Sequence, residues 1–375
     1  MKRRIFSFLF IAATLGLIVY IAFSNSDLTN AWEALFTLKV EWLFCAFLGW
    51  FGYMFFDMLG LYFFLRRQKY PISVSFATYI TLLGFYYCNI TPGSSGGQPM
   101  QVYYLNKRKI PVPIATSALS IKFLALQIMM VVFAGVLWAL NKDYVNAQLP
   151  RAKWFIYIGY GINFLSIPLI LLVALHRPLV QSILLFFVRI GAKMHIIKRP
   201  EERIVRIEAG MDMYHMSILR LMKYPKRLIG QLVFAGLSLL SLMSIPLSVY
   251  YAFGLTGVPW YQLLTVSFLL FISASYTPLP GASGAQEGGF LIFFAGAFTK
   301  GTIGLALLVW RFFSYYLFLL VGAVISIGGS LRGHGGGKAK APQGEPPAET
   351  PADAPPEPAE PRSEPAETQP QGEAT

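Results

Sequence analysis

The sequence predicts an all-α polytopic membrane protein in which six spanning helices and two re-entrant hairpins form an inverted-topology repeat. Hydrophobic residues make up 55% of the chain and charged residues 13%, a balance typical of proteins whose long apolar runs cross a bilayer as helices. Lysine and arginine gather in the short gaps between these runs, as they do in cytoplasmic loops. Two similar segments rich in glycine and proline interrupt apolar runs at corresponding places, which is typical of transporters built from repeats.

The first membrane repeat is predicted over residues 1–140. A first span over residues 5–23 starts in the cytoplasm, next to a basic cluster, and a second span over residues 42–65 returns there. Basic clusters also flank residues 73–109 on both sides, so this unit is predicted to enter and leave the membrane from the cytoplasm as a re-entrant hairpin. A third span over residues 112–140 then crosses outward.

The second membrane repeat, over residues 141–332, has the opposite orientation. Residues 176–227 carry eleven lysines and arginines and are predicted to be a cytoplasmic amphipathic insert, either on the inner leaflet or packed on the protein's own base. A second hairpin over residues 260–298 enters from outside, because the span before it ends there. The remaining spans are predicted over residues 154–174, 228–253 and 303–327.

The last segment, residues 333–375, is rich in proline and glutamate and has almost no apolar residue larger than alanine. Such a segment buries too little surface to offset the entropy of ordering, so a disordered cytoplasmic tail is predicted. Both termini are therefore placed in the cytoplasm.

Two short motifs hold the candidate site. They are TPGSSGGQP, from Thr91 to Pro99, and TPLPGASGAQE, from Thr277 to Glu287. One such motif alone is typical of an exposed turn. In hydrocarbon, however, broken backbone survives only where it lines a cavity enclosed by protein, so the repeated pair predicts a substrate site. Without the insertion Leu279-Pro280 the motifs align, and the paired candidates for substrate binding are Gly93 with Gly281, Ser95 with Ser283, Gly96 with Gly284, and Gln98 with Gln286.

Charged residues inside the apolar runs are the next candidates, because an intramembrane charge costs about 2.5–3.5 kcal/mol or more. Lys122 and Arg311 lie 29 and 30 positions after the first glycine of their motifs. Both are predicted near the bilayer centre, where a lysine and an arginine suit the phosphate of a lipid headgroup. The alternative is two structural ion pairs, Arg311 with Glu287 and Lys122 with Asp57.

Three side chains have more than one predicted role, and several kinds of site are excluded. Glu287 is a candidate for protonation and deprotonation during transport, and Gln98 and Gln286 suit hydrogen bonds to a headgroup or between helices. The scattered cysteines and histidines and the missing catalytic motifs indicate no metal and no cofactor. The net charge of +13 is explained by cytoplasmic loops that attract anionic inner-leaflet lipids, so nucleic acid is not an expected partner.

The motifs with their flanks, NITPGSSGGQPMQVYYL and YTPLPGASGAQEGGF, resemble the flippase-like transmembrane family over residues 5–330. This family is the membrane part of bacterial lysylphosphatidylglycerol synthases, the multiple peptide resistance factors, and their stand-alone relatives. In the two-part members a soluble domain transfers lysine from lysyl-tRNA to phosphatidylglycerol. The membrane part moves the product to the outer leaflet, which blunts cationic antimicrobial peptides. The resemblance implies a stand-alone member in a bacterial plasma membrane, because the globular sequence is expected to end near Arg332, before any transferase domain.

The predicted function is that of a lipid translocase. The membrane phospholipid that it moves between leaflets is lysylphosphatidylglycerol, another headgroup-modified lipid or a polyprenyl-linked lipid. A rival interpretation is a membrane-embedded phosphatidylglycerol lysyltransferase, or a subunit of one, with Glu287 as general base near the lipid phosphate. A third is a scaffold that recruits partners through the tail. The sequence leaves open whether the chain forms a homodimer or works with a separate synthase.

Overall fold

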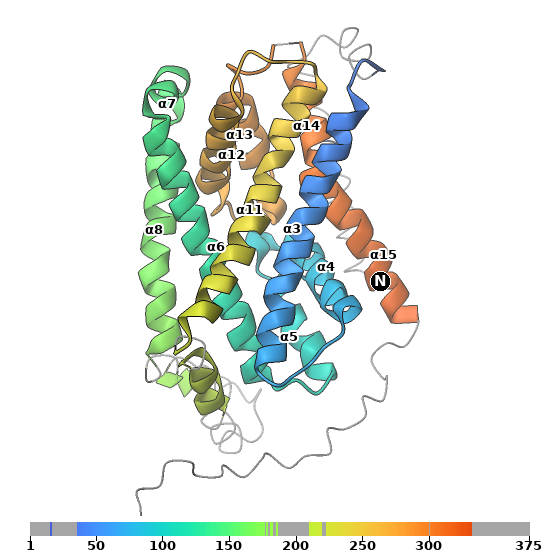
Figure 1. The fold of residues 1–375 in the computed structure, drawn as a ribbon, viewed down its shortest axis with the longest axis vertical. Helices are drawn as coiled ribbons and strands as arrows, with labels where there is room; N and C mark the ends of the chain where they lie inside the picture. The colour runs from blue at the N-terminus through green and yellow to red at the C-terminus, as the bar shows by residue number, and fades with distance from the viewer. Residues whose placement is uncertain are drawn as a thin grey trace, which may run out of the picture. The chain divides into compact units, whose positions relative to one another are not determined.

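The computed structural model describes residues 36–331, except residues 177, 179–180, 183–184, 187–209, 220–222 and 300, together with residue 16. The predicted first span over residues 5–23 apart from residue 16, the tail over residues 333–375 and most of the insert over residues 176–227 lie outside the described residues. All regular structure within the described part is helical, as the composition predicts (Figure 1).

Five helices of the described part are long and apolar enough to cross a membrane, and they coincide with predicted spans two to six. Each carries the run of about 20 predominantly apolar residues that ~30 Å of hydrocarbon requires. Two short helices, α7 (Lys142–Gln148) and η2 (Pro150–Ala152), connect the second of the five to the third. The five are α3 (Val40–Arg67), α6 (Val112–Leu140), α8 (Lys153–Leu175), α11 (Pro225–Ala252) and the α14–η4–α15 rod (Ile303–Arg311, Phe312–Tyr316, Leu317–Leu331), in which η4 is a π-helical turn.

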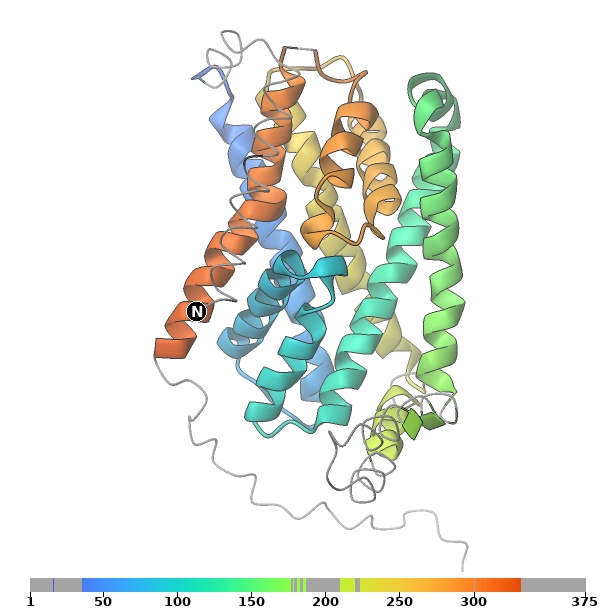
Figure 2. The same cartoon turned by 180° about the vertical axis from the view of Figure 1, so that it is seen from behind.

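Two helical hairpins complete the described fold. Their first helices have 17 and 15 residues, or about 25 and 22 Å at 1.5 Å per residue, which is too short for ~30 Å of hydrocarbon. Figures 1 and 2 show the hairpins reaching in from opposite ends of the helix bundle, with their tips facing each other. The hairpins consist of α4 (Val74–Ile90), η1 (Pro92–Ser94) and α5 (Gly97–Lys107), and of α12 (Trp260–Ala274), η3 (Pro280–Ala282) and α13 (Ala285–Phe293).

Each hairpin packs against the last long helix of the other half of the chain. α4 of the first hairpin contacts α15, and α12 of the second contacts α6. The most extensive helix pair is α3 with α11, which cross closely because glycines face Ser241. A Cβ atom at Gly49 would lie 2.8 Å from the Ser241 carbonyl oxygen, and one at Gly52 would lie 2.7 Å from the Ser241 Oγ. Small residues at such crossings let membrane helices approach each other.

Two hydrophobic clusters hold the hairpins in place. In the larger one, the rings of Phe290 and Phe294 on α13 stack with centroids 4.6 Å apart, and Trp310 of α14 stacks on Phe290 at 4.8 Å. The smaller one includes Leu105 of α5 and Leu61 of α3. The aromatic stack joins α13 to α14 and so positions Arg311, the residue after Trp310.

Basic residues from separate parts of the sequence gather at one end of the bundle. Figure 1 shows the ends of α3 and α5 and the start of α11 together, opposite the end that carries α7. The charged residues at these three helix ends are Arg66, Arg67, Lys107, Lys226 and Arg227.

A described part of the insert, helical residues 210–219, packs on the protein at this basic end. Ile218 is buried in the smaller hydrophobic cluster. The Nε2 of Gln68, just after α3, donates a hydrogen bond to the Ser217 carbonyl oxygen at 3.2 Å. This stretch therefore has its own protein neighbours.

Candidate functional site

Both motifs break the helical path with the same backbone. In each, an extended residue precedes a proline, because the proline ring disfavours helical geometry at the residue before it. The two residues after that proline are left-handed in both motifs: φ is 58° at Gly93 and 53° at Ser94, and 61° at Gly281 and 51° at Ala282. Only glycine adopts this region freely, so Ser94 and Ala282 store strain of about 1–3 kcal/mol each. Such strain is concentrated at functional sites.

Serine hydroxyls close the two turns with the same hydrogen bond. Ser95 Oγ donates to the Pro92 carbonyl oxygen at 2.9 Å, and Ser283 Oγ donates to the Pro280 carbonyl oxygen at 2.8 Å. The two serines are the pair that the sequence alignment matches. A hydroxyl that is bound to its own turn keeps oxygen lone pairs that can accept further hydrogen bonds.

The helices that follow the two turns begin differently. The N–H of Gly96, where φ is −83°, donates to Thr91 Oγ1 at 2.8 Å. The N–H of Gly284, where φ is +87°, donates instead to Glu287 Oε2 at 2.5 Å. A carboxylate in the first turn satisfies an otherwise unpaired N–H and interacts favourably with the partial positive charge of the helix start. Glu287 is therefore a helix cap as well as a candidate site residue.

One hydrogen bond joins the two hairpin tips directly, and a second ties the first hairpin to η4. The N–H of Gly93 donates to the Pro278 carbonyl oxygen at 2.8 Å. The hydroxyl of Tyr315, in η4, donates at 3.1 Å to the carbonyl oxygen of Asn89, which lies just before the first motif. The ring of Tyr315 also covers Gly281 so closely that no Cβ atom fits there. The two motifs, 186 positions apart in the alignment of Thr91 with Thr277, thus meet in the fold.

An ion pair lies beside the second motif. Nη2 of Arg311 is 2.6 Å from Oε1 of Glu287 and 3.5 Å from the Gly281 carbonyl oxygen. Oε1 is buried and accepts no hydrogen bond among the described residues, so this contact is an ion pair only. Arg311 is 4% exposed and Glu287 1%. The guanidinium carbon also lies 5.1 Å from the ring centroid of Trp310 and 5.4 Å from that of Tyr315. The buried Nε of Arg311 has no hydrogen-bond partner among the described residues, so the guanidinium keeps unused donor capacity.

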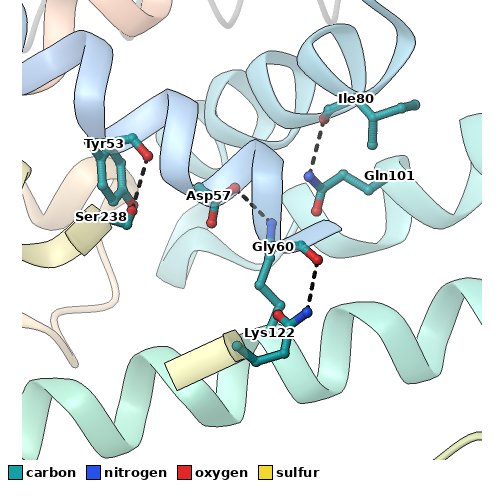
Figure 3. Close-up of polar contacts among 8 residues, drawn as sticks. Tyr53, Asp57, Gly60, Ile80, Gln101, Lys122 and Ser238 are labelled. Carbon is teal, nitrogen blue, oxygen red and sulfur yellow. Dashed lines mark hydrogen bonds and ion pairs between the residues drawn. The ribbon is translucent and has the colours of Figure 1, made fainter. Parts of the chain in front are cut away.

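A second ion pair joins α6 to α3. Nζ of Lys122 lies 2.8 Å from Oδ2 of Asp57, with side-chain exposures of 13% and 2% (Figure 3). A cavity of about 10 Å³ next to the pair is also lined by Gln231 of α11, whose Nε2 donates to the Gly60 carbonyl oxygen at 3.0 Å. That volume is close to the smallest that holds one water molecule. The pair is therefore buried among three helices but has room for one small polar neighbour.

The two candidate glutamines lie in different surroundings. Gln98 is exposed at the start of α5, whereas Gln286 is buried in α13. Gln101, one turn after Gln98, closes the first hairpin, because its Nε2 donates to the Ile80 carbonyl oxygen at 3.1 Å (Figure 3). Of the remaining candidates, Gly93, Ser95 and Gly284 are exposed, Gly96 and Gly281 are half-buried and Ser283 is buried.

The structure places each candidate cation against a carboxylate. Arg311 contacts Glu287 beside the second motif, and Lys122 contacts Asp57 between α3 and α6. These are the pairings of the alternative interpretation from sequence. A phosphate site formed by Lys122 and Arg311 stays a prediction, and it requires the carboxylates to give up their partners.

Two residues at the site were not predicted from sequence, Tyr315 and Asn163. Asn163 of α8 is 2% exposed. Its Nδ2 donates to the Ile272 carbonyl oxygen at 3.2 Å and to Ser275 Oγ at 3.0 Å, and its Oδ1 accepts from Gln127 at 2.6 Å. It thereby satisfies the end of α12, which stops within the apolar region. An amide in the predicted fourth span was a usable signal for Asn163, whereas Tyr315 was one of many aromatic residues.

A family model described as the lysylphosphatidylglycerol synthase TM region matches residues 4–322, which include both motifs and both ion pairs. The chain belongs to this family. The resemblance seen in the two motifs is thereby confirmed. No curated protein matches the chain. Membership of the lysylphosphatidylglycerol synthase TM family and the five long apolar helices together show a multi-pass membrane protein related to lipid modification or flipping.

Proposed function

We propose that this member of the lysylphosphatidylglycerol synthase TM family is a lipid translocase, which passes a phospholipid headgroup between leaflets at the tips of its two hairpins. The observation that carries the proposal is the contact between the tips. There the Gly93 N–H bonds to the Pro278 carbonyl oxygen, and the second tip lies beside the buried pair of Arg311 and Glu287. Broken backbone and buried charge occur together at membrane depth where a polar substrate is handled.

The helix packing supports an inverted-topology repeat of six spans and two re-entrant hairpins, with residues 5–23 as the first span. α4 rests on α15 and α12 rests on α6, so each half supplies the same kind of element to the other. The hairpins enter the bundle from opposite ends (Figure 2). In such repeats a pseudo-two-fold axis lies in the membrane plane, and the substrate site lies at the interface of the halves. The meeting tips occupy that interface.

Arg311 binds the lipid phosphate in this proposal. Its planar fork suits phosphate oxygens, and its Nε has no hydrogen-bond partner among the described residues. When a phosphate enters, the guanidinium exchanges one anion for another and stays paired, so the cost of a buried charge without a counter-ion falls on Glu287 and not on Arg311. Glu287 keeps the hydrogen bond from the Gly284 N–H during the exchange.

The other candidate site residues have supporting roles in binding the same headgroup. Lys122 leaves Asp57 to add a point charge to the same phosphate. Exposed groups at the tips, among them Gln98 and Ser95, hydrogen-bond the rest of the headgroup. The buried Ser283 holds the second turn in shape through its hydroxyl, and Gln286 hydrogen-bonds the headgroup or a neighbouring helix.

The rival function, a phosphatidylglycerol lysyltransferase in the membrane, requires a general base that can take a proton from the lipid. The candidate is Glu287, but its Oε2 accepts from the Gly284 N–H and its Oε1 contacts Arg311. Oε2 is therefore held in a hydrogen bond and Oε1 in an ion pair, so neither oxygen faces a proton that it could take from a lipid. This arrangement favours transport over chemistry.

The substrate and the orientation follow from the same features. Lysylphosphatidylglycerol is the first candidate lipid, because the matching family model is described as the transmembrane region of its synthase. We place the protein in a bacterial plasma membrane with both termini and the basic end of the bundle in the cytoplasm. There the basic residues attract anionic headgroups of the inner leaflet.

Liposomes that contain the purified protein and lysylphosphatidylglycerol test the proposal. A membrane-impermeant amine reagent reports how much of this lipid is in the outer leaflet, because the lysyl amine reacts without a synthetic label. The protein should speed the movement of lysylphosphatidylglycerol from the inner to the outer leaflet. Mass spectrometry should also identify this lipid among those that co-purify with the protein. A rate equal to that of protein-free liposomes would overturn the proposal. Formation of lysylphosphatidylglycerol from lysyl-tRNA would support the rival function.

A further inference from the structure

A cavity opens on the side of the bundle where α8 meets the end of α12. Its volume is about 220 Å³. One wall is apolar and the other carries hydroxyl groups. The apolar wall consists of Phe155, Ile158 and Ile162 of α8, and the opposite wall consists of Ser273, Tyr276 and Thr277.

The apolar wall belongs to a helix face that borders lipid. Phe155 is 62% exposed and Ile158 is 58% exposed, and α8 is the least buried of the five candidate spans. A mostly apolar helix that crosses a bilayer presents such a face to hydrocarbon chains. The cavity is therefore reached from the lipid phase.

The hydroxyl-bearing wall is held in place by α8. A Cβ atom at Gly159 would lie 2.6 Å from Cα of Ser273, so this glycine lets the two backbones touch. Nδ2 of Asn163 donates to Ser275 Oγ at 3.0 Å and fixes the end of α12. Thr277 is also the first residue of the second motif, so the cavity adjoins the tip of the second hairpin.

We propose that this cavity binds one acyl chain of a phospholipid together with its ester group. Its volume is below the ~300–1,000 Å³ of pockets that enclose a whole small ligand, so it fits one segment of a lipid. The apolar wall matches a hydrocarbon chain, and the hydroxyls of Tyr276 and Thr277 match the oxygens of an ester. The inference deepens the proposed function: the chain is held at α8 while the headgroup reaches the hairpin tips.

Phosphatidylglycerol with a photoactivatable diazirine in one acyl chain is the probe, and protein in liposomes is the sample. Mass spectrometry of the labelled peptides should place the lipid on residues 155–162 and 273–277. Ile158→Trp combined with Ile162→Trp fills the cavity and should lower labelling there about tenfold. Leu169→Trp is the matched control, since Leu169 is 59% exposed and lies eleven positions after Ile158, or about 16 Å along the same helix.

The pattern of labels separates the outcomes. Labels spread evenly over the exposed face of α8, as strong at Leu169 as at Ile158, would overturn the inference, because they would indicate ordinary surrounding lipid only. This comparison uses the unaltered chain, so it decides the matter even where the tryptophan variants fail to fold. Localised labels in a protein that moves no lipid between leaflets would support this site and overturn the translocase.

Discussion

Arg311 and Lys122 are both paired with carboxylates, but their surroundings differ. Arg311 and Glu287 are almost fully buried, whereas the Lys122 side chain is 13% exposed. Removing one partner of a buried ion pair costs about 3–5 kcal/mol, because the other charge is left without a partner. Glu287 and Asp57 are both buried, so we expect Arg311→Ala and Lys122→Ala each to lower the melting temperature in detergent, and Glu287→Gln to restore much of the loss in the Arg311 variant. An unchanged melting temperature in either alanine variant would contradict a structural role for that ion pair.

Arg311→Lys separates binding of a phosphate from structural pairing. A lysine keeps the positive charge beside Glu287 but loses the planar fork. A charged hydrogen bond is worth about 1.5–3 kcal/mol, so lipid movement should fall roughly ten- to hundredfold while the melting temperature changes little. The amine-reagent assay and thermal unfolding measure the two effects on one preparation. Normal lipid movement in Arg311→Lys would show that the fork is not used.

At the scale of the helices, the glycine turns of the two hairpins offer a matched comparison. Gly93 and Gly281 have nearly the same left-handed φ, but a Cβ atom at Gly93 would have no neighbour within 4 Å, whereas one at Gly281 would overlap the ring of Tyr315. Gly93→Ala should therefore cost only the left-handed penalty of about 1–2 kcal/mol. Gly281→Ala should cost distinctly more and should also slow lipid movement, because it displaces the tyrosine that links the tips. Similar melting temperatures for both variants would argue against this packing.

The interrupted end of α12 depends on α8. Asn163→Leu removes one of two side-chain donors to the Ile272 carbonyl oxygen, and it leaves Gln127 with only the backbone carbonyl oxygen of residue 163 as an acceptor. Such bonds between membrane helices are worth about 1–2 kcal/mol in model systems. We expect a corresponding loss of stability in thermal unfolding. Ser166→Ala is the control, since its hydroxyl bonds only within α8 to the Asn163 carbonyl oxygen, and it should change little. An equally large loss of stability in Ser166→Ala would show that the bonds of Asn163 to α12 have no special role.

At the scale of the whole molecule, the basic end of the bundle predicts the orientation in the membrane. Single cysteines at Lys109 and Lys226 should react with an impermeant thiol reagent only from the cytoplasm, and cysteines at Asp143 and Thr299 only from outside. Cys45 and Cys88 are replaced by alanine or serine first, because both are free thiols. Reaction of position 299 from the cytoplasm would rule out the second re-entrant hairpin and therefore the inverted repeat.

The amino-acid sequence by itself predicted the five long apolar helices of the described part, the places where the helical hairpins turn and the family. Apolar runs, basic gaps and proline–glycine turns are local properties of a chain. An apolar run in hydrocarbon forms a helix because a helix pairs its backbone N–H and C=O groups within the run itself. For this reason the helix Val112–Leu140 begins and ends where the sequence predicts. The equivalence of Gly93 and Gly281 was also readable, because left-handed turns select glycine.

Only the tertiary structure decided which groups the buried charges meet. The sequence was compatible with one phosphate held by two cations and with two ion pairs, because Lys122 and Asp57 are 65 positions apart and nothing local joins them. The packing of α6 on α3 and of α13 on α14 brings each cation to a carboxylate, and the phosphate site stays a prediction. The roles of Tyr315 and Asn163 emerged only from the fold, since each donates a hydrogen bond to a backbone carbonyl oxygen of another helix. Every residue has such a carbonyl, and packing alone determines which of them needs a partner.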